Sequence, residues 1–224
     1  MNIAIVQPPY LPWLGYFDML RKVDLMIFLD TVRMNLRSFQ RRNRIRTPTG
    51  WMWLTVPVLK DGVQSPIFRV AKVNESTGWR LKHWKAILSS YERAPHFDEY
   101  RGFFEAFYSE PHDSLLEVNV ALIKYVAKQL GLTTPARYAS ELEPEGKKTE
   151  LLLDICRKTA ASHYLSGPTA KNYLRPELFE AQGVELEFHE YKHPTYEQRF
   201  PGFFSYMSSI DLLFNTGDRA ARIL

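Results

Sequence analysis

The chain has 224 residues, of which 45% are hydrophobic, 24% charged and 14% aromatic. These proportions are ordinary for a globular protein and exclude disorder, collagen and coiled coil as descriptions of the whole chain. The formal net charge of +4 is mildly basic and favours anionic partners such as phosphates, nucleotides or polyanions.

The first third of the chain predicts short strands with one helix among them. The predicted strands are Asn2–Gln7, Asp24–Asp30, Trp51–Leu59 and Ile67–Val73. The first two are continuous apolar runs, which is typical of strands buried on both faces, and Leu14–Lys22 between them predicts a helix. Turns are expected at Thr47–Gly50 and Lys60–Gly62, because both stretches contain residues that favour turns.

The middle of the chain predicts helices, because apolar residues recur there at spacings of three and four. These helices are Thr77–Tyr91, Phe97–Tyr108 and Leu115–Leu130, with Gly131 ending the last. Further along, strands are predicted at Ala136–Ser140, His163–Ser166 and Val184–Tyr191, and helices at Lys148–Ala161, Pro176–Gln182 and Phe203–Phe214. This order predicts a Rossmann-like α/β fold with a mainly parallel sheet flanked by helices. We expect a single domain over residues 1–224, with a helical insertion at 77–131.

The single cysteine and the short apolar runs bear on the cellular compartment. Cys156 cannot form an internal disulfide, which favours a reducing cytoplasm and excludes a cysteine-rich zinc site. No stretch approaches the roughly 20 apolar residues that a membrane-spanning helix needs. The N-terminal segment lacks a basic leader and is broken by prolines, so we interpret it as mature sequence of a cytoplasmic protein.

The loop after the first predicted strand carries three aromatic side chains and an amide. In open parallel α/β sheets, ligands bind beyond the carboxyl ends of the strands. Gln7, Tyr10, Trp13 and Tyr16 are therefore candidate substrate-binding residues. Their rings can stack on a planar ring or a sugar face, and Gln7 can donate and accept hydrogen bonds. The alternative is that these rings plug the end of the core.

The segment from residue 30 to residue 46 is rich in arginine. Guanidinium groups suit the bidentate recognition of phosphates or carboxylates, so Arg37 and Arg44 are candidate ligands of a diphosphate, a phosphopantetheine arm or an acidic protein face. Asp30 ends a predicted strand and is a candidate catalytic acid. A solvated basic loop is the plain alternative. Binding of single-stranded nucleic acid is a third interpretation, which the low net charge disfavours.

Two histidines and one serine complete the candidates that the residues themselves suggest. His83, on a predicted helix, and His193, after the last predicted strand, are candidate general bases, although either can be structural. Ser166 ends a predicted strand outside any G-x-S-x-G motif, so we expect it to bind substrate. Cys156 lies in an apolar pattern, which predicts that its side chain packs in the core. Without zinc-helix spacing, G-x-G-x-x-G or a Walker loop, neither a metal nor a bound cofactor is predicted.

Several motifs, taken in order from about residue 3 to residue 217, are similar to those of one known family. They are IVQPPYLPWLGYF, FLD, RSFQRRNRI, WLTVPV, YERAPHF, YLSGP, HPTYEQ and SSIDLLFNTG. Together they resemble the WbqC-like family. The positions that match the family pattern include Gln7, Tyr10, Tyr16, Asp30, Arg37, Asn43, Arg44, His83, Ser166, His193 and Gln198.

The resemblance implies a role in bacterial surface-polysaccharide (O-antigen) biosynthesis. It implies an acyl- or aminoacyltransferase that acts on the amine of a nucleotide-linked amino sugar, with acyl carrier protein phosphopantetheine or acyl-CoA as donor. In that reaction His83, Asp30 or His193 would accept the proton of the amine, and Gln7, Asn43 or a backbone amide near Ser166 would stabilise the oxyanion. The alternative is a non-catalytic nucleotide-sugar or partner-binding protein of the same pathway. Nucleic acid is not an expected partner.

Overall fold

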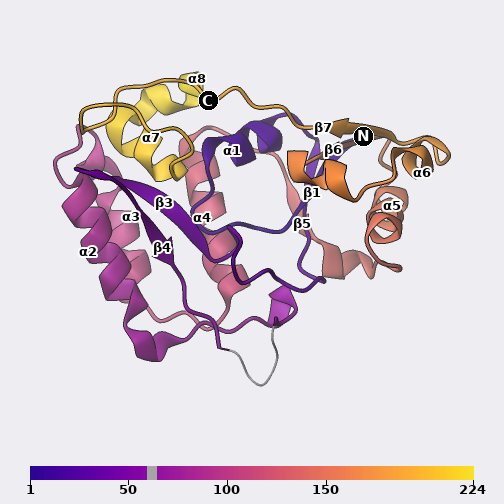
Figure 1. Cartoon of the computed structure of the whole chain (residues 1–224), viewed down its shortest axis with the longest axis horizontal. Coiled ribbons are helices and arrows are strands. Elements are labelled where there is room, and N and C mark those ends of the chain that lie inside the picture. Colours follow the sequence, from indigo (N-terminus) through magenta and orange to yellow (C-terminus); the bar gives the residue numbers. More distant parts are fainter. Residues whose placement is uncertain (60–64) are drawn as a thin grey trace. The chain divides into compact units, whose positions relative to one another are not determined.

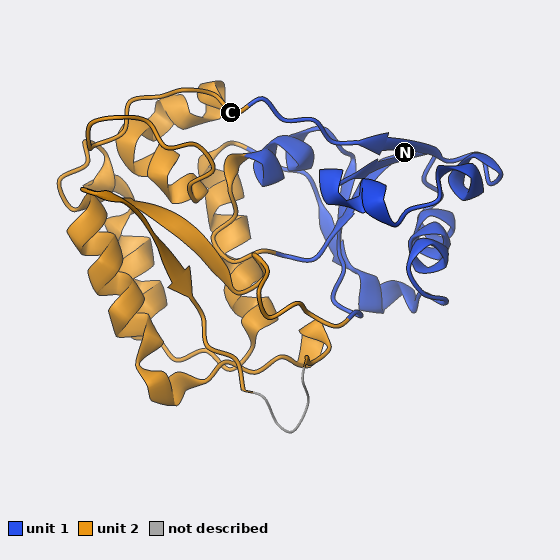
Figure 2. Ribbon diagram, in the orientation of Figure 1, with its two compact units in different colours: residues 1–8, 15–32, 132–192 blue, residues 9–14, 33–131, 193–224 orange. Residues whose placement is uncertain are grey.

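A computed structural model of the protein describes residues 1–59 and 65–224 (Figure 1). The described residues form two compact units, each built from three stretches of chain (Figure 2). Unit 1 comprises residues 1–8, 15–32 and 132–192, and unit 2 comprises residues 9–14, 33–131 and 193–224. The single domain over residues 1–224 stays a prediction. The turn predicted at Lys60–Gly62 lies outside the described residues.

Unit 1 contains a five-stranded sheet in which every neighbouring pair of strands is parallel. Its strands are β1 (Asn2–Val6), β2 (Leu25–Phe28), β5 (Ala136–Tyr138), β6 (His163–Ser166) and β7 (Glu185–Phe188). Their order across the sheet is β5-β2-β1-β6-β7, so the chain builds outward from β1 in both directions. This doubly wound order confirms the predicted Rossmann-like α/β fold and puts the topological switch point between β1 and β6.

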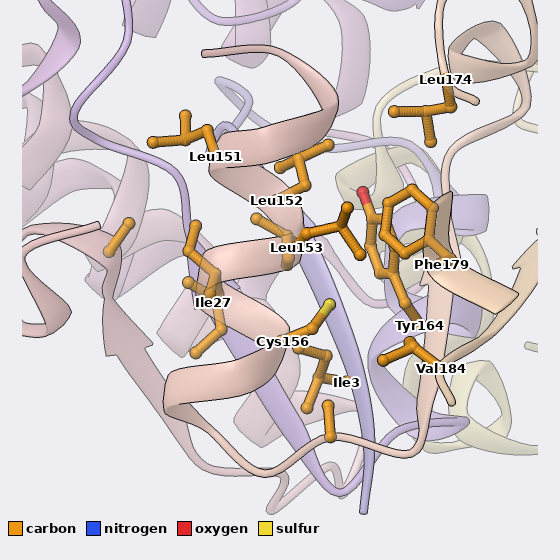
Figure 3. Close-up of a cluster of buried hydrophobic side chains, with 14 of the residues drawn as sticks. Ile3, Ile27, Leu151, Leu152, Leu153, Cys156, Tyr164, Leu174, Phe179 and Val184 are labelled. Carbon is orange, nitrogen blue, oxygen red and sulfur yellow. The ribbon is translucent and has the colours of Figure 1, made fainter. Parts of the chain in front are cut away.

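The helices of unit 1 are α1 (Leu14–Arg21), which enters this unit at Gly15, α5 (Thr149–Lys158) and α6 (Pro176–Glu180). The α5 helix contributes Leu152, Leu153 and Cys156 to a buried cluster with Ile3 and Ile27 of the strands (Figure 3). Burial of each such aliphatic side chain stabilises the fold by about 1.5–3 kcal/mol. Burial also raises the pKa of the Cys156 thiol to about 12, and the predicted packing role of this residue is confirmed.

Unit 2 combines a β-hairpin with helices that lie between β2 and β5, and after β7, in the sequence. The hairpin joins β3 (Arg42–Thr47) to β4 (Gly50–Thr55) in antiparallel register, which confirms the turn at Thr47–Gly50. The helices are α2 (Trp79–Tyr91), α3 (Phe97–Ser109), α4 (Leu115–Gln129), α7 (Ser209–Thr216) and α8 (Ala220–Ile223). None of the helices in the described part of the chain is long and apolar enough to cross a membrane.

One predicted strand is wrong. Ile67–Val73 contains a turn of 3₁₀ helix, η1 (Phe68–Val70), in place of a strand. Phe68 is fully buried whereas Val70 is 61% exposed, so two side chains that a strand would place on one face lie in opposite environments. Further 3₁₀ turns are η2 (Glu75–Thr77), η3 (Ala139–Leu142), η4 (Pro168–Asn172) and η5 (Gly217–Arg219).

The last predicted helix is shorter than its apolar pattern suggests. Phe203–Phe214 was expected to be helical throughout, but α7 begins only at Ser209. The side chain of Ser208 accepts a hydrogen bond from the amide of Ile210, which satisfies a donor that the first turn would otherwise leave free. Residues 203–208 precede this helix and form a loop in place of its predicted first turns.

Candidate functional site

Two predicted site residues lie at the switch point of unit 1. Gln7 directly follows β1, and Ser166 is the last residue of β6, its neighbour in the sheet. Both occupy the carboxyl edge, where ligands bind in doubly wound folds. The Ser166 side chain is 1% exposed, and its hydroxyl donates to the Tyr164 hydroxyl at 3.2 Å. The Ser166 hydroxyl is therefore buried and hydrogen bonds with a side chain of its own unit.

Asp30 and Tyr16, the other predicted residues of this unit, are buried. The Asp30 carboxylate accepts two hydrogen bonds from Ser140, one from the backbone amide at 2.9 Å and one from the hydroxyl at 2.6 Å. The Tyr16 hydroxyl has no hydrogen-bond partner among the described residues, and burial raises the pKa of this phenol far above its ordinary value. Asp30 thus ties the chain after β2 to the chain after β5, and Tyr16 stays protonated.

In unit 2, the structure brings the predicted residues Tyr10 and His83 into direct contact. The Tyr10 hydroxyl hydrogen bonds with His83 Nδ1 at 2.8 Å and with the Tyr108 hydroxyl at 2.5 Å. The His83 ring also hydrogen bonds with the backbone of Thr55. Burial lowers the pKa of His83 to about 4, so the imidazole is neutral at pH 7. The polar atoms of this cluster are paired with one another, which is typical of a structural histidine.

Asn43 joins the hairpin to the proline-rich loop that carries the predicted aromatic residues. Its side-chain amide donates to the Leu11 carbonyl at 2.6 Å, and its side-chain oxygen accepts from the Arg44 amide at 2.8 Å. Leu11 has a φ of 43°, in the left-handed region that residues other than glycine rarely adopt. Since Asn43 is only 1% exposed, its amide holds this loop in place.

Gln198 closes a loop near the C-terminal end of the chain. Its Nε2 donates to the Phe204 carbonyl at 2.9 Å and to the Asp211 carboxylate at 2.8 Å, and its Oε1 accepts from the Phe204 amide at 2.9 Å. Asp211 also accepts hydrogen bonds from the hydroxyls of Tyr91 and Tyr196. Burial raises the pKa of Asp211 above its ordinary value. These hydrogen bonds hold the backbone at Phe204 and therefore the position of the residues that follow it.

Tyr206 lies just beyond that loop, and no sequence motif singled it out. Its φ is 59°, and its ring packs against Trp13 and His193 with centroid distances of 5.5 and 5.3 Å. Its carbonyl accepts a hydrogen bond from Arg44 Nη2 at 3.1 Å. Three predicted residues therefore meet around a tyrosine with a strained backbone, as is common at functional sites. We call Trp13, Arg44, His193 and Tyr206 the Tyr206 cluster.

His193 is the predicted base of the Tyr206 cluster. Its Nδ1 hydrogen bonds with the Pro194 carbonyl at 2.8 Å, which makes Nδ1 the protonated nitrogen and gives Nε2 the lone pair. Burial lowers the pKa of His193 below its ordinary value, so the ring is neutral at pH 7. Nε2 therefore carries the lone pair that can accept a proton, and this atom is buried beneath the neighbouring side chains.

Arg44 also belongs to a face of the hairpin on which guanidinium groups and aromatic rings alternate. The Arg42 guanidinium lies 4.4 Å from the centroid of the Trp53 ring, and that of Arg44 lies 5.1 Å from the centroid of Trp51. The ring of Phe39 contacts Trp53 with a centroid distance of 5.9 Å. We call these five residues, Phe39, Arg42, Arg44, Trp51 and Trp53, the hairpin face.

The arginines of the hairpin face are not neutralised within the structure. Neither Arg42 nor Arg44 forms an ion pair with a carboxylate in the described part of the chain. The Nε of Arg44 is buried without a hydrogen-bond partner among the described residues, and burial lowers the pKa of this guanidinium. A buried donor without an acceptor costs about 1–3 kcal/mol, which an anionic ligand would offset.

The remaining predicted residue, Arg37, lies on an exposed turn before β3. Its backbone amide donates to the Asn35 side chain at 2.9 Å.

A hollow of about 380 Å³ opens in unit 2, and none of the predicted site residues lines it, although its lining residue Tyr108 hydrogen bonds with Tyr10. Its lining residues are Glu75, Gly78, Arg80, Leu81, Trp84, Glu105, Tyr108 and Ser109. No group of three or more His, Cys, Asp or Glu side chains within residues 1–59 and 65–224 is placed to hold a metal ion.

Known proteins match nearly the whole chain. A model of the WbqC-like protein family matches residues 7–223, which confirms the resemblance drawn from the ordered motifs. An uncharacterized protein of Mycobacterium tuberculosis (strain ATCC 25618 / H37Rv) is 34% identical over 221 residues, which cover 98% of this chain and 95% of the relative. No solved structure matches the chain significantly. The matched region includes both the hairpin face and the Tyr206 cluster.

Proposed function

Because the chain belongs to the WbqC-like protein family, we propose that it is an acyl- or aminoacyltransferase acting on the amine of a nucleotide-linked amino sugar. Its pathway would be the bacterial surface-polysaccharide (O-antigen) assembly that the family resemblance implies. The observation that supports this proposal most is the unneutralised guanidinium of Arg44, which adjoins Trp51 and Tyr206. A cation among exposed rings is suited to a phosphorylated ligand that also carries a base or a sugar.

The hairpin face and the Tyr206 cluster supply both kinds of contact that a nucleotide-sugar needs. Guanidinium groups bind phosphate oxygens through parallel hydrogen bonds, and aromatic rings stack on planar bases. Arg42 and Arg44 supply the charge. Trp51 and Tyr206 supply accessible rings, because their side chains are 42% and 47% exposed. We therefore assign the diphosphate to the two arginines.

In the proposed reaction, the amine nitrogen of the sugar attacks the acyl carbonyl of a thioester on carrier-protein phosphopantetheine or coenzyme A. The amide bond forms, the carbon–sulfur bond breaks, and the sulfur leaves as a thiolate. His193 Nε2 accepts the proton that the amine loses and passes it to the thiolate. Of the three predicted bases, we choose His193 because its ring packs against Tyr206, whose carbonyl accepts a hydrogen bond from Arg44.

Transfer can be tested by incubating the full chain with a dTDP-linked amino sugar and a panel of acyl-CoA and acyl-loaded carrier proteins. Mass spectrometry of the sugar nucleotide should show an increase equal to the acyl group. The increase should be lost in His193→Gln and kept in His163→Gln, because His163 is a half-buried imidazole of β6 in unit 1. An unmodified sugar across the whole panel would contradict the proposal.

A non-catalytic nucleotide-sugar or partner-binding protein of the same pathway is the second candidate. The observation that favours it is that two of the three predicted bases, Asp30 and His83, are buried and hydrogen bonded within their own units. Thermal-shift screening separates the candidates. Stabilisation by nucleotide-sugars without product in the transfer assay would favour a binding protein, and stabilisation by a protein partner alone would favour a scaffold.

A further inference from the structure

The hairpin face extends further than the binding of one phosphate group requires. The Trp53 ring contacts both Phe39 and Trp51, with centroid distances of 5.9 and 5.7 Å. Trp51 adjoins the Arg44 guanidinium, which donates a hydrogen bond to the Tyr206 carbonyl. A continuous path of rings and guanidinium groups therefore runs from Phe39 to the Tyr206 cluster, all within unit 2.

The register of the hairpin explains how two cations come to lie side by side on this path. Side chains two residues apart on a strand point the same way, so Arg42 and Arg44 of β3 share a face, with Cα atoms about 6.6 Å apart. The Trp53 ring of β4 lies between them, 4.4 Å from the Arg42 guanidinium and 5.8 Å from that of Arg44. Two neighbouring cations without carboxylate partners among the described residues match the charge of a diphosphate.

The two ends of the path differ in chemistry. At one end, the Tyr206 cluster contains His193, the proposed proton acceptor. At the other end, Phe39 supplies a ring that is 47% exposed and no ionisable group. An amine that gives up a proton must lie at the His193 end. The planar base of the nucleotide is then left for the Phe39 end, where stacking needs only an accessible aromatic face.

We infer that unit 2 binds a nucleotide-sugar in one orientation, with its base on Phe39, its diphosphate on Arg42 and Arg44, and its amino sugar toward Tyr206 and His193. The orientation rests on the proposed function, because the position of the amine sets the direction of the ligand. It gives substrate-contacting roles to Phe39 and Tyr206, which were not among the predicted site residues.

Calorimetric titration of the full chain with dTDP and with a dTDP-hexose separates the two ends. Phe39→Leu should weaken both ligands roughly tenfold, because each loses the stacking of its base. Tyr206→Leu should leave the affinity for dTDP within about twofold and remove most of the extra affinity of the dTDP-hexose. Tyr173→Leu changes a ring that is 54% exposed in unit 1, and this matched control should change neither affinity.

Circular dichroism and melting temperatures establish that each variant is folded. Tyr206→Phe keeps the ring contacts with Trp13 and His193 and should retain the extra affinity of the dTDP-hexose within about twofold. If the wild-type chain binds dTDP and the dTDP-hexose equally well, the sugar makes no contact at Tyr206 and the orientation is overturned. It is also overturned if Tyr206→Leu weakens dTDP while Phe39→Leu does not.

These outcomes are distinct from failure of the transferase proposal. If the sugar is acylated but Phe39→Leu leaves dTDP binding unchanged, the enzyme stands and the orientation is overturned. If Phe39→Leu and Tyr206→Leu behave as expected but no acyl donor modifies the sugar, the orientation is supported as a binding mode and the transferase proposal fails.

Discussion

Unit 1 and unit 2 use their polar side chains in opposite ways. At the carboxyl edge of the unit 1 sheet, Asp30 and Ser166 are at most 2% exposed and hydrogen bond with partners in their own unit. On the hairpin face of unit 2, Arg42 and Arg44 stack on indole rings and have no carboxylate partner in the part of the chain that the structure describes. Unneutralised charge therefore lies on the hairpin, although ligands of doubly wound sheets usually bind at the carboxyl edge.

His83 provides the largest test of this division, because it lies in unit 2 but is hydrogen bonded as fully as Asp30. Its pKa falls from an ordinary value of 6.5 to about 4 on folding. The neutral ring therefore stabilises the fold above pH 6.5, and this contribution is lost as the pH falls from 6.5 to 4. The free energy of unfolding should drop by about 3 kcal/mol over that window, as measured by urea denaturation at a series of pH values.

A variant without the titrating ring isolates this contribution from the carboxylates that titrate nearby. His83→Gln keeps a hydrogen-bonding side chain but takes up no proton, so its free energy of unfolding should decline less between pH 6.5 and 4. Its affinity for dTDP should match that of the wild type within about twofold. Identical pH dependence in the two proteins would show that protonation of His83 does not oppose folding.

Asp30→Ala is the next largest expected change and probes the opposite side of the comparison. Loss of the carboxylate leaves the Ser140 amide and hydroxyl without their acceptor, which should lower the free energy of unfolding by about 2 kcal/mol. Asp113→Ala, at an exposed position, is the control and should cost under about 0.5 kcal/mol. A double-mutant cycle with Ser140→Ala in urea should return a coupling of about 1 kcal/mol. A coupling near zero would mean that the hydroxyl bond contributes nothing.

The sheet of unit 1 was predicted from the sequence, whereas only the turn and the second strand of the hairpin in unit 2 were predicted. Strands such as β2 are continuous apolar runs between turn residues, and that signal is local. In β3, arginines alternate with the buried Asn43 and Ile45, and the charges masked the period of two. The signal was nevertheless present, because three arginines recur at every second position before a turn that was itself predicted.

The residue types of the site were also predictable, but their partners were not. Asn43 and Gln198 carry amides that suit either a ligand or the backbone, and only the folded chain shows that both bind backbone groups. Tyr206 was missed because the apolar residues around it predicted a helix. Contacts such as that of Tyr10 with His83 join positions 73 residues apart, and such long-range pairs leave no local pattern.

Arg42→Gln sharpens the comparison on the unit 2 side. Because the Arg42 guanidinium only stacks on Trp53, its loss should lower the free energy of unfolding by under about 1 kcal/mol. The same substitution should weaken dTDP binding roughly tenfold, or by about 1.4 kcal/mol, in calorimetric titration. Arg93→Gln, at an exposed position of the same unit, should alter neither quantity. A larger effect on stability than on affinity would show that Arg42 serves the fold.

Ser166→Ala should have the smallest effect, and it is the substitution most able to break the comparison. The hydroxyl donates a single hydrogen bond, 3.2 Å long, to Tyr164, so the free energy of unfolding should fall by less than about 1 kcal/mol. The affinity for dTDP should stay within about twofold, because the residues that follow β1 and β6, Gln7–Pro8 and Gly167–Pro168, carry no positive charge. A roughly tenfold loss of affinity at unchanged stability would place the phosphorylated ligand at the carboxyl edge of unit 1, and the division of roles between the units would then be wrong.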